Sequence, residues 1–432
     1  MSLWLTDTVL RGPLLGSILM SLCTALVGAI TLMRKKALIG ETLSHATFPG
    51  VAIGMLIAGY NFPNKEGLTF VCILLGAFIS ALCAQFFIEK LLKYKEKSDV
   101  ALCYILASFL GAGVLLVSFI QQAHAIWYRT IQVFFYGQAA TMTDFHVVIY
   151  AVLSLCVCFV ITLLYRPIKA VCFDPVFSQT IGIKKNWVFQ ILSVLLSLAI
   201  VIGIRCAGVV LITGMLIAPA IVSRCLTKRF SSFLIVSSCV GVISSALGNY
   251  ITTIPVNSGL SLHYIPTGPS TVMVASILAF LALLLSPRKG LLPKLFRRWK
   301  FQKNCLLENL LKAIWKESRV NFKHILKWNL ATPWMVFYAL KKLAHQGWIL
   351  KEKGMYRLTD DGNKKAAYIV RLHRLWELYL AQNLGGAVEH IHHSAEEMEH
   401  LITPDIEAKL TKVLFNPTKD PHKQPIPSKE LL

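Results

Sequence analysis

The chain has 432 residues, of which 55% are hydrophobic and only 15% are charged, and its formal net charge is +22. Soluble domains contain about 25% charged residues, so this composition excludes a wholly soluble protein and indicates membrane-spanning helices. No GxxxxGK(S/T) loop occurs, which excludes ATP binding of that kind. The sequence shows no arrangement of a nucleophile with a general base, so we do not expect an enzyme.

Residues 1–286 contain nine apolar segments of about 20 residues, the length that a helix needs to cross a bilayer. They occupy residues 13–33, 46–62, 69–88, 101–120, 146–165, 187–204, 208–224, 231–249 and 269–286. Alternate loops are rich in Lys and Arg, whereas the others hold only Lys65, Arg129 and Arg205. Positive loops stay in the cytoplasm, so we expect an inner-membrane protein with an external N-terminus and a cytoplasmic tail.

Glu41 and His45 lie close to the entrance of the second span. Ionisable groups at membrane depth are costly, and they therefore point to a functional role, here a place on a transport path. A helix cap or a packing role explains His45 about as well.

The loop at residues 172–186 has the pattern of a short amphipathic helix. Asp174 is a suitable N-cap, and Pro175 suits the first helical position. Phe173, Phe177 and Ile181 follow at intervals of four and share one face. Such a helix either docks into the groove of a partner protein or lies on the lipid surface.

These features belong to a longer series of motifs in the membrane half. The series comprises residues 40–46 (GETLSHA), 49–52 (PGVA), 134–137 (FFYG), 173–175 (FDP), 181–182 (IG), 208–211 (GVVL) and 215–220 (MLIAPA). In these motifs and their order, residues 1–286 resemble the permease subunit of ABC importers for zinc, manganese or iron. The resemblance implies that 173–183, with Phe173, Asp174, Pro175 and Phe177, is the coupling helix that rests on a separate ATPase subunit. It further implies an external metal-binding protein and a second permease subunit.

Residues 304–358 have a different pattern, that of a soluble winged helix-turn-helix. Helices are expected at 304–316, at 321–329 and from Thr332-Pro333 to about residue 345, followed by two short strands around a turn at 351–354. The basic side chains would meet phosphates. The candidate DNA contacts are Lys323, Thr332, Trp334, Lys341, Lys342, Lys351 and Arg357. The third helix nevertheless exposes an aromatic face without the Arg, Asn or Gln that read bases, so a winged helix used for protein contacts is an alternative.

Carboxylates and imidazoles recur at helical spacing in the last 70 residues. His373 and Glu377 are four apart, and His392, Glu396, Glu399 and His400 follow at intervals of four, three and one. This donor set suits divalent metals of intermediate hardness. A solvated charged helix with clustered histidines would show the same spacing.

The motifs at 373–378 (HRLWEL), 392–400, 406–410 (IEAKL), 416–417 (NP) and 425–427 (PIP) resemble the metal-binding and dimerisation domain of the iron- and manganese-dependent repressors. The resemblance implies that Glu396, Glu399 and His400 form a primary site and that His373, Glu377 and His392 are ancillary or shared ligands. It implies a tail homodimer that binds operator DNA. Glu396, at a position where iron regulators often have Cys, favours Mn²⁺ or Fe²⁺ as the bound ion. The ligand position of the first helix corresponds to Asn309, a poorer donor.

We therefore expect a mainly α-helical protein with four parts: a transmembrane permease at 1–286, a basic linker at 287–303, the winged helix at 304–360 and a helical metal-binding and dimerisation domain at 361–432. The combination is similar to chlamydial permease–repressor fusions. Its predicted function is metal import fused to metal-dependent DNA binding. The alternative is a permease whose tail senses cytosolic metal and gates transport without DNA.

Overall fold

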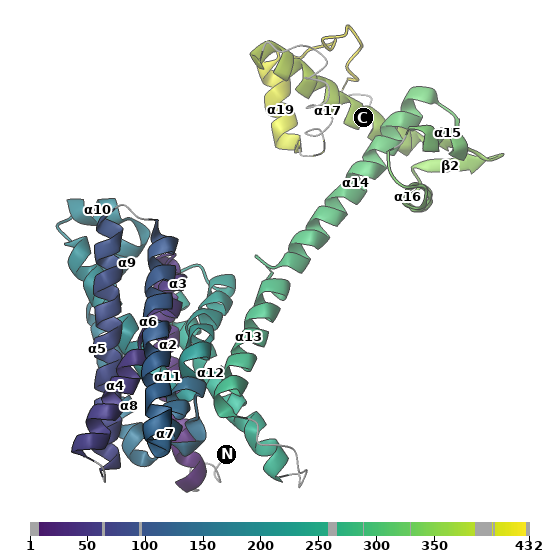
Figure 1. Cartoon of the computed structure of the whole chain (residues 1–432). Coiled ribbons are helices and arrows are strands. Elements are labelled where there is room, and N and C mark those ends of the chain that lie inside the picture. The colour runs from purple at the N-terminus through teal and green to yellow at the C-terminus, as the bar shows by residue number, and fades with distance from the viewer. Residues whose placement is uncertain are drawn as a thin grey trace. The chain divides into compact units, whose positions relative to one another are not determined.

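The computed structural model of the chain describes residues 8–62, 65–94, 97–257, 266–287, 289–328, 330–384, 400 and 402–428. These residues form two compact units, Met1–Pro293 and Lys294–Leu432. Both units are mainly helical (Figure 1). The predicted fold class is confirmed.

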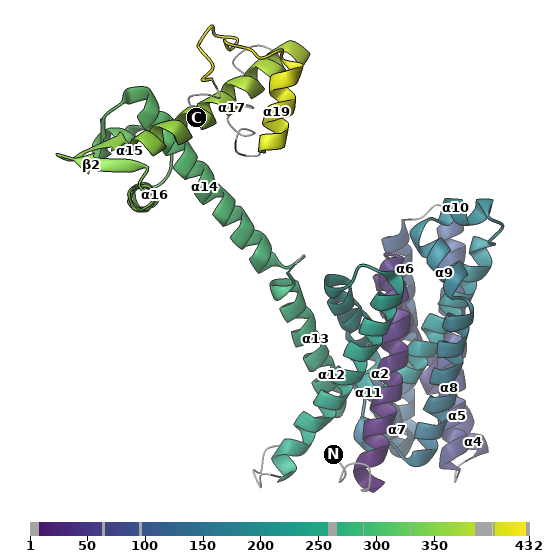
Figure 2. The same ribbon diagram turned by 180° about the vertical axis from the view of Figure 1, so that it is seen from behind.

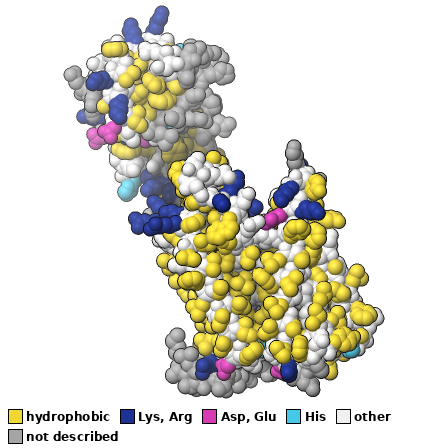
Figure 3. Space-filling model, turned by 90° about the vertical axis from the view of Figure 1, so that its left-hand side faces the viewer, with side chains coloured by type: hydrophobic (Ala, Val, Ile, Leu, Met, Phe, Trp, Pro, Cys, Tyr) yellow, Lys and Arg dark blue, Asp and Glu magenta, His cyan; other side chains and the backbone are white. Residues whose placement is uncertain are grey.

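The first unit is a helical bundle. Its elements are α2 (Thr8–Met33), α3 (Ala37–Ala46), α4 (Phe48–Asn61), α5 (Glu66–Lys93), α6 (Ser98–Ala123), α7 (Ala125–Tyr136), η1 (Ala139–Thr141), α8 (Asp144–Leu163), α9 (Tyr165–Phe173), α10 (Pro175–Thr180), α11 (Lys185–Leu226), α12 (Phe230–Asn257) and α13 (Thr267–Leu285). On the face in Figure 3, hydrophobic side chains cover the wall of this bundle and charged side chains lie near its ends. Such a surface matches a bilayer with polar layers on both sides.

Among the described residues, eight helices are long and apolar enough to cross a membrane. One of them, α11, has 42 residues and loses helical geometry at Gly208, where φ is 80° and ψ is 163°. A straight helix would hold residues 203 and 212 about 13 Å apart. Instead, a Cβ atom placed on Gly203 would lie 2.1 Å from Cδ1 of Ile212. The chain therefore turns back at Gly208, and α11 supplies two crossings, in agreement with the nine predicted spans.

The second predicted span, 46–62, begins earlier than the sequence indicates. The membrane-crossing segment runs from Ala37 to Asn61 and includes both α3 and α4. The polar residues Glu41 and Ser44 lower the mean hydropathy of residues 37–46, so hydropathy alone does not include them in the span. Glu41 and His45 consequently lie in α3, the first helix of this candidate span.

The turn at Gly208 depends on the absence of a side chain. A positive φ is strained for other residues, and a Cβ atom there would lie 2.5 Å from the backbone oxygen of Phe135. We expect Gly208→Ala to destabilise the permease by about 3 kcal/mol or more. Thermal unfolding in detergent, followed by size-exclusion chromatography, measures the loss.

Gly111→Ala in α6 is the matched control, because a Cβ atom at that position meets nothing within 4 Å. In a helix this change leaves stability unchanged or raises it by up to about 1 kcal/mol. If both variants unfolded at the wild-type temperature, the turn at residue 208 would not require a glycine.

The second unit begins within α14 (Leu291–Glu317) and continues as a winged helix. Its further elements are β1 (Val320–Asn321), α15 (Phe322–Lys327), α16 (Pro333–His345), β2 (Ile349–Glu352), β3 (Met355–Leu358), α17 (Asp360–Leu384) and α19 (Pro404–Val413). The strands form an antiparallel sheet in the order β1-β3-β2. A core from α14, α15, α16 and the strands holds these elements together. The sequence predicted the helices and the hairpin but not β1.

Pro333 occupies the first turn of α16 as predicted, and Thr332 precedes it without capping the helix through its side chain. Val336, Ala339, Leu340 and Leu343 are buried, so these residues form the core face of α16. The basic stretch assigned to a linker is helical from Leu291 onward, because it continues the helix of the winged domain.

Candidate functional site

The candidate metal centre is built on α17. His373 and Glu377 lie one turn apart, and only 7% and 2% of their surfaces are exposed. Nε2 of His373 lies 4.0 Å from Oε2 of Glu377. A buried carboxylate is costly unless it is paired or bound to a metal, so this helix face is built around a charge.

A second imidazole reaches the same carboxylate from the C-terminal segment. Nε2 of His422 lies 3.2 Å from Oε1 of Glu377. Sequence reasoning missed His422, because it stands alone and far from the other histidines along the chain. Its neighbours in the repressor-like motifs at 416–417 and 425–427 were the only signal that this segment belongs with α17.

Two arginines of α17 fasten the C-terminal segment to the helix. The buried Arg371 donates through Nε to Oε1 of Glu407 (2.9 Å) and through Nη1 to the Pro427 carbonyl (2.8 Å). Arg374 donates to Gln424 Oε1 (2.6 Å) and also to the Pro425 carbonyl. Charge-assisted bonds of this kind are among the stronger ones in proteins. They hold the segment that carries His422 against α17.

His400 lies against the first helix of the winged domain. Its Nδ1 atom is 2.6 Å from Oε2 of Glu308 on α14. The expected first-helix position, Asn309, instead lines a pocket, and its buried Oδ1 has no hydrogen-bond partner in the described part of the chain. The structure therefore brings the carboxylate of the adjacent residue, Glu308, to His400 as a candidate metal ligand in place of Asn309. Glu308 is a further residue that sequence reasoning missed.

The remaining predicted ligands His392, Glu396 and Glu399 lie outside the described residues. Within the described ranges, no group of three or more His, Cys, Asp or Glu side chains is placed to hold a metal ion. The carboxylates and imidazoles around Glu377 and Glu308 fit Mn²⁺ or Fe²⁺ in donor type.

The candidate DNA-binding residues surround α15, α16 and the wing. Lys323, Thr332, Lys341 and Lys351 are exposed, and Lys342 is half-buried. Arg357 donates to Glu352 at 2.7 Å within the hairpin, and this pairing offsets its charge. Trp334 is 76% exposed, with Phe337 and Tyr338 also exposed on the same helix. Helix α16 thus presents aromatic groups, as its sequence predicts.

The candidate coupling residues lie on α9 and α10 at one end of the bundle, and α7 lies at the other end (Figure 1, Figure 2). Oδ1 of Asp174 accepts hydrogen bonds from the backbone N–H groups of Val176 (3.0 Å) and Phe177 (2.9 Å), which confirms the predicted N-cap. Pro175 begins α10. Phe177 is 57% exposed, and Phe173 and Ile181 are also exposed. This exposed apolar surface suits contact with another protein or with lipid.

Glu41 and His45 occupy successive turns of α3. Glu41 is exposed and His45 is half-buried. Nδ1 of His45 is buried without a hydrogen-bond partner among the described residues. The structure thus places a carboxylate and an imidazole one turn apart in the first helix of a candidate membrane span.

Each of the two units matches a known protein family. The family described as "ABC 3 transport family" matches residues 6–286. The chain belongs to this family. The family described as "Iron dependent repressor, metal binding and dimerisation domain" matches residues 359–428. The protein is therefore an ABC 3 permease that carries an iron-dependent-repressor metal-binding domain, as the two resemblances indicated.

Three relatives illustrate the match. A "Probable metal transport system membrane protein" of Chlamydia trachomatis is 34% identical, with 98% of this chain and 97% of the relative covered. The "Manganese transport system membrane protein MntC" of Bacillus subtilis is 28% identical over 89% of this chain and 87% of the relative. The solved structure of PsaBC from Streptococcus pneumoniae in complex with Fab shares the fold of the permease, with 23% identity, a TM-score of 0.55 and coverage of 66% of this chain and 94% of that chain.

Proposed function

We propose that this ABC 3 permease imports a divalent metal, which is manganese, iron or zinc, and that its tail is a metal-dependent DNA-binding regulator for which Mn²⁺ or Fe²⁺ is the favoured ion. The observation that carries the proposal is the union, in one chain, of a metal-transport permease with a repressor domain whose buried Glu377 is flanked by two imidazoles. The chlamydial relative matches over nearly the full length.

The permease needs partners for this work. A separate ATPase subunit would dock on the end of α9 through Phe173 and on α10 through Phe177, since the chain has no phosphate-binding loop of its own. A second permease subunit and an extracytoplasmic metal-binding protein would complete an importer in the inner membrane. The basic loops favour a cytoplasmic position for α10 and for the tail. Glu41 and His45 offer oxygen and nitrogen donors to an ion within the span.

The tail would hold its metal through His373, Glu377, His392, Glu396, Glu399 and His400. A bound divalent ion would supply positive charge that neutralises these carboxylates. Glu308 would orient His400, because its carboxylate lies against Nδ1 and fixes the imidazole ring. Metal would thereby brace α14 of the winged helix against the dimerisation domain and order a homodimer.

DNA binding by the fragment 294–432 tests the regulator. We expect Mn²⁺ to strengthen binding to operator DNA from the region upstream of the transporter genes. Affinity is expected to fall steeply with salt, because the exposed lysines mainly neutralise phosphates. Lys341→Ala is expected to weaken binding on all sequences alike and to reduce the salt slope by about 1. Fluorescence anisotropy over a range of salt concentrations measures both effects.

The control for this experiment is Lys364→Ala on α17, which removes an equally exposed lysine outside the winged helix. The aromatic surface of α16 favours the alternative of a tail that senses metal and gates transport. A fragment that binds Mn²⁺ but ignores DNA at low salt would establish that alternative and refute the regulator.

A further inference from the structure

The helix that follows the last membrane span exposes an apolar stripe. Leu291, Leu292, Leu295, Phe296 and Trp299 of α14 lie at helical spacing, and each is between 48% and 61% exposed. The second half of the same helix buries its leucines in the winged-helix core. The first half of α14 therefore presents exposed apolar groups.

The charge of this segment is entirely positive. Residues 288–303 contain seven Lys and Arg and no Asp or Glu. On a helical projection, Lys294, Arg297 and Lys300 fall on the side opposite the leucines, and Arg298 flanks the apolar stripe. A helix with a basic side and a Leu, Phe and Trp side lies in the interface of an anionic membrane, with its tryptophan at the level of the headgroups.

The position of the segment in the chain brings it close to a membrane. Only five residues separate the end of α13 at Leu285 from the start of α14 at Leu291. That connection is fastened to the bundle, since Ser286 Oγ donates to the Cys225 carbonyl (2.9 Å) and Lys289 Nζ to the Arg224 carbonyl (2.9 Å). Helix α14 therefore starts at the end of a membrane-spanning helix, within reach of lipid headgroups.

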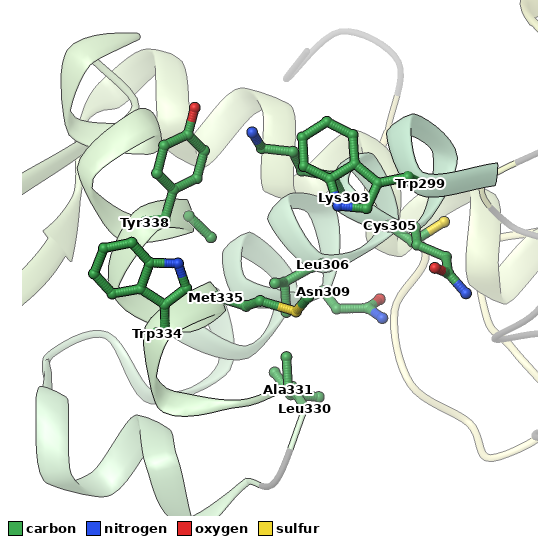
Figure 4. A pocket seen from close by; sticks show the side chains of 12 residues that line it. Trp299, Lys303, Cys305, Leu306, Asn309, Leu330, Ala331, Trp334, Met335 and Tyr338 are labelled. Carbon is green, nitrogen blue, oxygen red and sulfur yellow. The ribbon is translucent and has the colours of Figure 1, made fainter. Parts of the chain in front are cut away.

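The apolar stripe continues into a cavity of 690 Å³ between α14 and α16 (Figure 4). Trp299 and Leu306 line it from α14, and Trp334 and Tyr338 line it from α16. Nζ of Lys303 lies 3.8 Å from the centre of the Tyr338 ring and 4.8 Å from that of Trp299. A hydrogen bond from this ammonium group lowers the pKa of Tyr338. The aromatic surface of α16 is thus continuous with the basic amphipathic helix.

We propose that residues 291–303 of α14, together with the exposed aromatic residues Trp334 and Tyr338, bind the anionic headgroup surface of the membrane in which the permease is embedded. Lysine and arginine attract anionic lipid, and the Leu, Phe and Trp side chains enter the interface. This surface includes the N-terminal end of α16, so membrane binding and the DNA binding proposed above would exclude each other. The membrane would then hold the winged helix away from DNA.

The test uses the full-length protein in nanodiscs with brominated acyl chains, which quench tryptophans in the interface. The discs contain either phosphatidylcholine alone or an equal mixture with phosphatidylglycerol. The contribution of Trp299 is the difference in quenching between the wild type and Trp299→Phe. We expect this difference to be present in the anionic discs and to disappear in the neutral discs or at high salt.

Lys294→Gln combined with Arg298→Gln is expected to weaken the interaction on the order of tenfold, seen as a shift in the phosphatidylglycerol content needed for quenching. The matched control is Lys323→Gln with Lys327→Gln, two exposed lysines on α15, and it is expected to leave quenching unchanged. Monodisperse elution and retained metal uptake establish that each variant is folded. The proposal is overturned if Trp299 contributes no quenching, if its contribution is equal in both lipids, or if the control pair loses as much quenching as the test pair.

Discussion

Metal uptake is expected to fall to background when Phe177 is replaced by Ala, although the permease still folds and inserts. Phe177 projects from α10 with 57% of its surface exposed, so its loss costs the isolated bundle little. It would, however, remove an apolar anchor from a contact with the ATPase, and such anchors dominate the energy of protein interfaces. Uptake of radioactive Mn²⁺ by cells that express the complete transporter measures the effect.

Two substitutions at Asp174 separate the capping role of this residue from its charge. Asp174→Lys removes the acceptor of two backbone hydrogen bonds, which costs about 1 kcal/mol and unwinds the six-residue helix. We expect it to abolish uptake. Asp174→Asn keeps a good cap and is expected to retain most uptake.

Tyr94→Ala, at an exposed tyrosine that ends α5, is the control for Phe177→Ala. Undiminished uptake by Phe177→Ala would contradict docking through α10. It would favour a helix that lies on the lipid surface.

The fragment 294–432 is expected to gain thermal stability when Mn²⁺ binds. A ligand at about 100 times its Kd stabilises a fold by about 2.7 kcal/mol, which corresponds to a rise in Tm of about 10 °C for a unit of this size. The unfolded chain has no preformed site, so the binding energy adds to the folding energy. Differential scanning calorimetry with and without metal gives the shift.

Replacing Glu377 by Gln or His400 by Ala is expected to remove most of this gain. Gln preserves the volume of the buried side chain at 377 but replaces the anionic donor by a weak neutral one. Glu317→Gln is the matched control, because it alters a His–Glu pair that lies in the winged helix, exposed and away from α17. If Mn²⁺ raised the Tm of Glu377→Gln and His400→Ala as much as that of the wild type, the assigned ligands would be wrong.

Several parts of this protein follow from local patterns in the sequence. Long apolar segments with alternately charged loops predict the spans, because a helix in lipid must satisfy its own backbone and avoid charge. The Asp174-Pro175 pair predicts the start of α10, since a cap acts within three residues. The aromatic face of α16 follows from helical spacing. Each of these features depends on residues that are close along the chain.

Other features depend on contacts between distant residues, which no local pattern records. The connection at Gly208 turns back because the backbone of residues 135–137 packs against a position without a side chain. Glu308 meets His400 across 92 positions of the sequence, and His422 meets Glu377 through a segment fastened by Arg371 and Arg374. The sequence by itself therefore determined the class of the protein, its spans and most of its candidate donors. Only the tertiary structure decided which donors face one another, because that choice depends on how α14, α17 and the C-terminal segment pack.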